Sequence, residues 1–218
     1  MANIGIVGGT FDPIHNGHLL LGRQAYVEYK LDSVWYMPSG QPPHKRSRII
    51  TDARKRCDMV SLALEGEAHF SLSEFETSRA GNTYTAQTLR LLKEAYPEHV
   101  FSFIVGADSL YEIENWYHPE QVLSSVRILA AEREYPKEHL SVDRQMAYLT
   151  EKYSCDIKKL HCNELDISSE EIRRMVRCKE DIRQFVPEKV GEYIQCHHLY
   201  QEVSNESGNT QIAGKAEA

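Results

Sequence analysis

Short apolar runs that end in glycine alternate with segments of helical periodicity along most of this chain. The run Ile4–Val7 ends at a glycine doublet, and the run Val100–Val105 ends at Gly106. Between such runs, apolar residues recur every three or four positions, as they do over Leu19–Tyr29. Strands that are buried on both faces give continuous apolar runs, and parallel strands need helical crossovers. The alternation therefore predicts an α/β fold with a doubly wound parallel sheet.

The same two patterns predict the remaining elements. Strands are expected over 33–37, 70–76, 126–131 and 156–160, and helices over 51–64, 85–95, 119–123, 140–153, 169–176 and 187–196. Thr51 or Asp52 is expected to cap the first of these helices. The 218 residues suffice for one domain, which we place at 1–203. The polar end of the chain, 204–218, is predicted to be disordered.

Composition argues against several classes of protein. The 25 basic and 32 acidic residues give a net charge of −7, which disfavours nucleic acid as a partner. No run approaches the roughly 18 apolar residues of a membrane helix, and the N-terminus does not resemble a signal peptide. Five cysteines without a C-x-x-C pair fit a reducing compartment. We expect a cytoplasmic protein without membrane partners, and a homo-oligomer is left open.

The loop after the first predicted strand carries the densest set of chemical groups. It reads Gly-Gly-Thr-Phe-Asp-Pro-Ile-His-Asn-Gly-His over residues 8–18. Its glycines let backbone N–H groups approach an anion, and the helix that follows directs its positive end to the same place. His15 and His18 add side-chain donors there. The glycine spacing fits neither G-x-G-x-x-G nor a P-loop, so a dehydrogenase or a P-loop protein is disfavoured.

A second candidate loop, Ile-Ser-Ser-Glu-Glu-Ile-Arg, covers residues 167–173 and opens a late helix. Ser168 and Ser169 at a helix N-terminus, with Arg173 one turn in, would form a cradle for an anion. The alternative is an ordinary helix cap made by one of the serines. The cap is favoured for this loop alone, whereas the two loops together favour a phosphate site.

Both loops match signatures of a known superfamily. The first contains the H-x-G-H signature of the nucleotidyltransferases, and the second resembles their I-S-S-T-x-I-R signature, with Glu170 where threonine or serine is usual. The segments 37–45 (Met-Pro-Ser-Gly-Gln-Pro-Pro-His-Lys), 79–85 and 106–109, together with Trp116, resemble those of bacterial nicotinate-nucleotide adenylyltransferases. Gln87 departs from the aspartate that is common in that family. On residues 3–195 the chain is identified as a member of this family, which implies a Rossmann-like nucleotidyltransferase fold.

The resemblance implies a reaction and a set of residues for it. The adenylyl group of ATP would pass to nicotinate mononucleotide, giving nicotinate adenine dinucleotide and pyrophosphate in NAD biosynthesis. Mg²⁺ is expected to come with ATP, and no residue is assigned as a metal ligand. The implied catalytic residues are His15, His18 and Arg173. ATP is expected to contact Gly8, Gly9, Thr10, Phe11, His15, His18, Gly106, Asp108, Ile167, Ser168, Ser169 and Arg173. Nicotinate mononucleotide is expected to contact Ser39, Lys45, Thr83, Tyr84, Thr85, Asp108, Trp116 and Tyr117.

The acceptor side leaves alternatives open. An aromatic face at Trp116 suits a pyridine ring, and Lys45 suits a phosphate, but Trp116 could equally be a core ring. Thr83 or Thr85 could simply cap a helix. Adenylylation of another phosphate, such as phosphopantetheine, is the rival reaction. A nucleotide sensor that binds without turnover is the rival outside enzymes, and the presence of both histidines disfavours it.

Overall fold

The computed structural model describes residues 1–41, 50–131, 141–162 and 167–201. Three of the predictions therefore lie outside the described residues. They concern Lys45 with its proline-rich loop, the start of the helix at Leu140, and the tail 204–218. The assignment of residues 1–203 to one domain stays a prediction.

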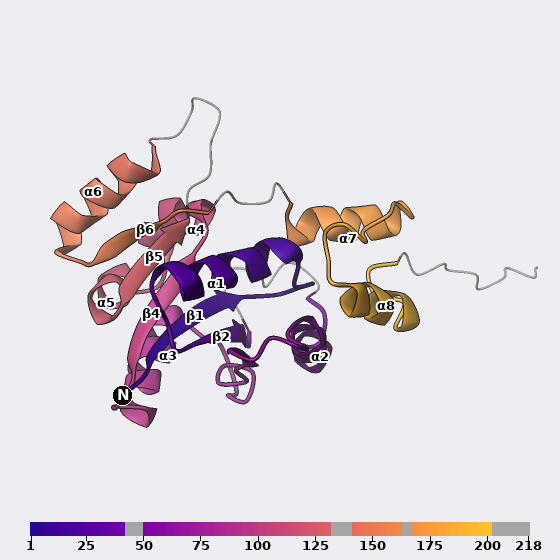
Figure 1. The fold of residues 1–218 in the computed structure, drawn as a ribbon, viewed down its shortest axis with the longest axis horizontal. Coiled ribbons are helices and arrows are strands. Elements are labelled where there is room, and N and C mark those ends of the chain that lie inside the picture. Colours follow the sequence, from indigo (N-terminus) through magenta and orange to yellow (C-terminus); the bar gives the residue numbers. More distant parts are fainter. Residues whose placement is uncertain (42–49, 132–140, 163–166, 202–218) are drawn as a thin grey trace, which may run out of the picture.

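Six parallel strands form one sheet in the order β3-β2-β1-β4-β5-β6 (Figure 1). They are β1 (Asn3–Gly9), β2 (Ser33–Pro38), β3 (Phe70–Leu72), β4 (Val100–Val105), β5 (Arg127–Ala131) and β6 (Ile157–Leu160). The order reverses between β1 and β4, where Ile6 lies opposite Phe103. In such sheets ligands bind beyond the carboxyl ends of the strands at the reversal. The predicted doubly wound parallel sheet is confirmed.

Helices cover both faces of the sheet. They are α1 (Asn16–Glu28), α2 (Ala53–Ala63), α3 (Thr85–Ala95), α4 (Ala107–Glu112), α5 (Pro119–Ser125), α6 (Val142–Tyr153), α7 (Ser169–Arg177) and α8 (Glu188–Cys196), with a short 3-10 helix η2 (Ile113–Asn115). Successive strand residues point to opposite faces, so Ile6 packs with α3, α4, α5 and α6. Val7 packs with α1, α2, α7 and α8. The two apolar cores therefore follow directly from the continuous apolar runs in the strands.

The structure differs from the sequence predictions over residues 70–76 and at α4, and it decides between the two candidate caps of α2. The strand expected over 70–76 ends at Leu72, because a turn follows in which Ser78 N donates to Glu74 O (2.9 Å). The helix α4 was not predicted, since its six residues are too few to show a period. Of the two candidate caps for α2, Asp52 makes the bond, accepting from Arg54 N at 2.9 Å. The other expected helices and strands are found within a few residues of their predicted ends.

The last two helices lie with α2 on one side of the molecule (Figure 1). In this part of the chain, α8 packs against α2, and Asn16 N at the start of α1 donates to Phe185 O (2.8 Å). The C-terminal segment is thereby held against the loop between β1 and α1. None of the helices in the described ranges is long and apolar enough to span a membrane.

Candidate active site

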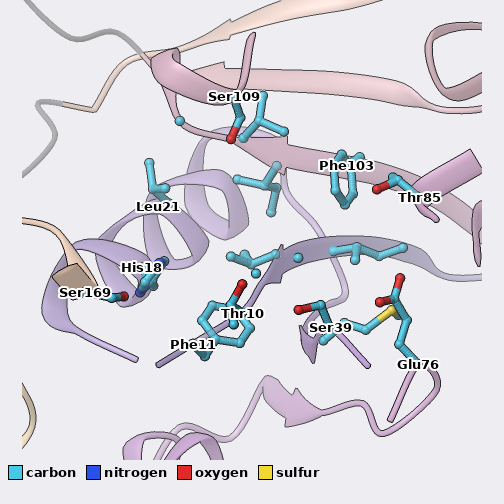
Figure 2. A pocket seen from close by; sticks show the side chains of 18 of the residues that line it. Thr10, Phe11, His18, Leu21, Ser39, Glu76, Thr85, Phe103, Ser109 and Ser169 are labelled. Atoms are coloured by element: carbon cyan, nitrogen blue, oxygen red, sulfur yellow. The ribbon is translucent and has the colours of Figure 1, made fainter. Parts of the chain in front are cut away.

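A cavity of about 590 Å³ opens beyond the carboxyl ends of β1 and β4. This volume is in the usual range for small-molecule sites. Every residue expected to contact ATP or the mononucleotide lines it, except Lys45, which lies outside the described residues. His18 and Ser169 lie on one side of the cavity, and Ser39, Glu76 and Thr85 lie on the other (Figure 2). The fold thus brings both signature loops and the expected acceptor residues to one place, and their contacts with ligands stay a prediction.

The start of α1 holds the two histidines in a fixed arrangement. His15 is the N-cap residue, and its backbone N–H donates to His18 Nδ1 at 3.2 Å. The two rings stack with centroids 3.7 Å apart, while Phe11 meets the His18 ring edge-on at 4.9 Å. Since Nδ1 accepts a hydrogen bond, a neutral His18 ring carries its proton on Nε2. His18 is therefore set up as a hydrogen-bond donor through Nε2.

His15 is the more deeply buried of the two rings. Only 7% of its surface is exposed, and burial lowers its pKa to about 4. Its Nδ1 atom has no hydrogen-bond partner among the described residues. A Cβ at Gly17 would approach this atom to 3.0 Å, so the glycine between the histidines makes room for the ring. The His15 ring is neutral at pH 7 and keeps unused hydrogen-bonding capacity.

The start of α7 is tied to the first loop by side chains. Ser168 caps the helix, its hydroxyl oxygen accepting from Glu171 N at 3.1 Å. Ser169 Oγ donates to Pro13 O at 2.8 Å, and Arg173 Nη1 donates to Asp12 O at 2.6 Å. The alternative of a helix cap at Ser168 is thus confirmed, and the single hydroxyl proton of Ser169 is already committed. What α7 can offer an anion is its N-terminal backbone, the hydroxyl proton of Ser168 and the remaining donors of the Arg173 guanidinium.

The opposite side of the cavity carries hydroxyl and aromatic groups. The hydroxyls of Ser39 and Thr83 are buried without a hydrogen-bond partner among the described residues. Neither Thr83 nor Thr85 caps α3, because the N-cap residue is Tyr84 and its side chain makes no cap bond. That alternative for the threonines was wrong. The Tyr84 and Tyr117 rings lie 4.3 Å apart. Together these groups form a surface suited to a flat, polar ligand.

Trp116 has features of both a core residue and a ligand-binding residue. Its ring is partly buried and meets Phe103 edge-on, with centroids 6.2 Å apart. It also lines the cavity. A packing role and a ligand-binding role are therefore compatible for Trp116, since its ring packs against the core and also lines the cavity.

Similarity to known proteins identifies the family. The cytidylyltransferase-like family model matches residues 6–175. A protein of Lachnoclostridium phytofermentans named "Probable nicotinate-nucleotide adenylyltransferase" is 40% identical over 200 residues, covering 92% of this chain and 100% of that protein. A relative of the same name from Bacillus mycoides is 37% identical over 201 residues, with 92% and 100% covered. This chain belongs to the nicotinate-nucleotide adenylyltransferase family.

Solved structures show the same fold at lower identity. The nicotinic acid mononucleotide adenylyltransferase of Plasmodium falciparum complexed with NaAD matches with a TM-score of 0.74 and 22% identity, covering 92% of this chain and 98% of that one. The same protein complexed with APC matches with a TM-score of 0.72. At this identity the likeness supports the Rossmann-like nucleotidyltransferase fold alone.

Two residues depart from the family pattern, and they differ in position. Glu170 lies in the first turn of α7 and lines the cavity. Gln87 is exposed on α3 and is not among the residues lining the cavity. The departure at Gln87 therefore leaves the lining of this adenylyltransferase site unchanged, whereas Glu170 places a carboxyl group beside it.

Three residues near the site were not identified from the sequence. Asp12 is 4% exposed and Glu76 8% exposed, and both line the cavity. Glu76 Oε1 accepts from Thr88 Oγ1 at 2.7 Å. Arg56, 1% exposed, donates to Thr10 O at 2.7 Å and to Ser39 O at 2.8 Å, which fixes the loops after β1 and β2. Asp12 could have been noticed within the first loop, but nothing in the local sequence marks Glu76 or Arg56.

The described residues contain no group of three or more His, Cys, Asp or Glu side chains that could hold a metal ion. The carboxylates that line the cavity are Asp12, Glu76, Asp108 and Glu170. Such scattered single carboxylates suit contact with an ion that is already bound to a ligand.

Proposed function

We propose that this chain transfers the adenylyl group of ATP to nicotinate mononucleotide and releases pyrophosphate. The main support for this function is one cavity (Figure 2). It joins the N-terminal end of α1, with His15 and His18, to a side lined by hydroxyl and aromatic groups. The first part suits a triphosphate and the second suits a pyridine nucleotide. The named activity of the bacterial relatives supports the same acceptor.

The reaction needs one displacement at phosphorus. A phosphate oxygen of the mononucleotide forms a bond to the α-phosphorus of ATP, and the bond from that phosphorus to the oxygen bridging to the β-phosphorus breaks. The leaving electron pair goes to pyrophosphate. Positioning and charge stabilisation are the protein's main contributions to such a step. We assign His18 Nε2 and the His15 ring to the α- and β-phosphates, where negative charge builds up.

The remaining triphosphate contacts are assigned to the two loops. Thr10, Gly8 and Gly9 line the cavity after β1, next to the start of α1. Arg173 and the N-terminal turn of α7 are assigned to the β- and γ-phosphates. We expect Mg²⁺ to arrive with ATP and to be held mostly by phosphate and water. When bound, the ion neutralises phosphate charge.

The acceptor pocket is proposed to prefer the acid over the amide. Nicotinate carries a carboxylate where nicotinamide carries an NH₂ group, so a pocket of backbone N–H donors satisfies the acid and leaves the amide mismatched. Donors near Tyr84 and Tyr117, whose rings are 4.3 Å apart, are the candidates. An unmatched buried donor costs roughly 1–3 kcal/mol per contact, so a preference on the order of 10²-fold in kcat/KM is expected.

A pyrophosphate-release assay tests the reaction and the acceptor together. ATP and Mg²⁺ are combined with nicotinate mononucleotide, nicotinamide mononucleotide, phosphopantetheine or no acceptor. We expect fast release with the first, release about 10²-fold lower in kcat/KM with the second, and none above background with the others. Equal rates with both mononucleotides would contradict the preference for the acid, but they would still support adenylyl transfer. Release only with phosphopantetheine, or ATP binding without any release, would overturn the proposal.

We also propose that this reaction takes place in the cytoplasm, because the cysteines are free thiols. Three of them, Cys57, Cys155 and Cys162, are buried. Thiols without disulfide partners fit a reducing compartment.

A further inference from the structure

Asp12 is a junction between the first loop and three distant parts of the chain. Its Oδ1 accepts from Tyr200 Oη at 2.7 Å, and its Oδ2 accepts from Thr51 N at 3.2 Å. Its backbone oxygen accepts from Arg173 Nη1 at 2.6 Å. The residue is only 4% exposed and lines the cavity. Thr51, Arg173 and Tyr200 therefore all meet the first loop at Asp12.

Tyr200 reaches this junction from the C-terminal end of the described chain. It follows α8, and the chain turns back there through two left-handed residues, His198 (φ 50) and Tyr200 (φ 63). Non-glycine residues rarely adopt this conformation, and they persist in it where surrounding contacts hold them. Burial, followed by the charge of Asp12, raises the pKa of Tyr200. The phenol therefore stays protonated and donates to the carboxylate throughout the physiological pH range.

The contact leads on to a residue assigned to ATP. Arg173 lines the cavity and donates to the backbone oxygen of Asp12. Tyr200 donates to the side-chain carboxylate of the same residue. We propose that Tyr200 is a positioning residue for adenylyl transfer, acting through Asp12 on the placement of Arg173. This inference rests on the proposed function. Tyr200 touches no reacting atom, and its effect is on where a phosphate-binding guanidinium lies.

A second tyrosine–aspartate pair in the same region serves as a matched control. Tyr193 Oη donates to Asp58 Oδ2 at 2.9 Å and joins α8 to α2. Neither residue is among those lining the cavity. The two pairs share their chemistry and the C-terminal location of their tyrosines, with bonds of 2.7 and 2.9 Å, and the Asp58 pair is the more exposed. A purely structural role would give Tyr193→Phe and Tyr200→Phe similar consequences.

The test compares Tyr200→Phe with Tyr193→Phe in the pyrophosphate-release assay. We expect Tyr200→Phe to raise the KM for ATP about tenfold, because misplacing a positioned group costs one to two orders of magnitude. The KM for nicotinate mononucleotide should change less than about twofold. Tyr193→Phe should leave both constants within about twofold of wild type and lower the thermal midpoint by a smaller amount, since Asp58 is more exposed than Asp12.

A double-mutant cycle identifies Arg173 as the intermediary. In the Arg173→Ala background, Tyr200→Phe should change kcat/KM for ATP less than about twofold, since the group it positions is gone. Unchanged ATP kinetics in Tyr200→Phe, equal losses in both phenylalanine variants, or a full tenfold effect without Arg173 would each overturn the inference. Wild-type turnover in the same assay tests the proposed function separately. If Tyr200→Phe does not fold, Asp12→Asn, which keeps one acceptor oxygen, is carried through the same cycle and the same outcomes decide.

Discussion

Two helix N-termini meet at the cavity and use their polar groups differently. We call them the α1 corner, with His15 and His18, and the α7 corner, with Ser168, Ser169 and Arg173. At α1, His15 Nδ1 is buried without a partner among the described residues, and His18 Nδ1 is occupied so that Nε2 is the donor. At α7, Ser168 caps the helix and Ser169 donates to Pro13 O. Arg173 holds Asp12 O at 2.6 Å. The His15 ring keeps hydrogen-bonding capacity in reserve, whereas at α7 the Ser169 hydroxyl proton and one Arg173 donor are already bonded inside the protein.

This difference separates a reactive corner from a supporting one. Buried polar groups are normally paired, so an unpaired one at a cavity marks a place where a ligand completes the site. Groups that are already paired hold loops in position, and removing them loosens the loops before it removes a ligand contact. The α1 corner should therefore govern the chemical step, and the α7 corner should govern the binding of ATP and the alignment of the first loop.

The largest expected effect is at His18. His18→Ala should lower kcat about 10²- to 10³-fold with the fold intact, because loss of one donor to transition-state charge typically costs ~3–4 kcal/mol. Steady-state kinetics with saturating ATP and nicotinate mononucleotide measure it. A variant within threefold of wild type would show that the α1 corner is not the reactive one.

The variant His18→Asn separates catalysis from capping at the same position. Its side-chain oxygen can still accept from His15 N, which bonds His18 Nδ1 at 3.2 Å, but it does not reproduce the Nε2 donor. We expect His18→Asn to be about as slow as His18→Ala and more resistant to thermal unfolding. If asparagine restored activity, the capping bond rather than the Nε2 donor would be what the reaction requires.

The second prediction uses the burial of His15. Its pKa is lowered to about 4 in the folded protein, below the ordinary value of 6.5 that it regains on unfolding. Between these values the unfolded chain binds the proton and the folded protein does not. Above pH 6.5 both states are neutral and the ring has no effect. As pH falls toward 4 it destabilises the fold, by about 3 kcal/mol in full.

His15→Gln removes this titration. Urea unfolding at a series of pH values should show that the variant loses less stability than wild type between pH 6.5 and 4. His198→Gln, which alters an exposed histidine, controls for general effects of removing an imidazole. Parallel pH profiles for wild type and His15→Gln would mean that the buried ring is not held neutral, and that the α1 corner lacks the reserve assigned to it.

The sheet and most helices could be predicted because their signals are local. Val100–Val105 is an apolar run interrupted only by Ser102. Both ends of α3 were predicted correctly, since its apolar residues keep a helical period. The failures are where that signal weakens. Over 70–76 the alternation was faint and a turn at Glu74 ended the strand, and α4 is too short to show any period.

In the candidate site too, residues in local motifs could be predicted and residues that act from distant parts of the chain could not. The loops 8–18 and 167–173 carry their glycines, histidines and serines in short motifs, so they could be found by reading along the chain. Arg56 and Tyr200 could not, because each acts on a loop distant in sequence and has no motif around it. Their roles arise only when α2 and the C-terminal segment pack beside the loop after β1.

The smallest predicted effect is at Ser168, and it tests the α7 corner directly. Ser168→Ala removes a helix cap, which should cost about 1 kcal/mol of stability. The KM for ATP should rise less than about threefold, because the Ser168 hydroxyl is a single neutral donor beside the Arg173 guanidinium, and one such hydrogen bond is worth only about 0.5–1.5 kcal/mol. Ser141, which caps α6 away from the cavity, is the matched control, and Ser141→Ala should lose a similar or smaller amount of stability with unchanged kinetics. Should Ser168→Ala instead raise the KM for ATP tenfold or more with little change in stability, the hydroxyl would be a phosphate ligand. The Ser168 hydroxyl would then bind the triphosphate together with Arg173 and the N-terminal turn of α7, and its loss would cost ATP binding rather than only a helix cap.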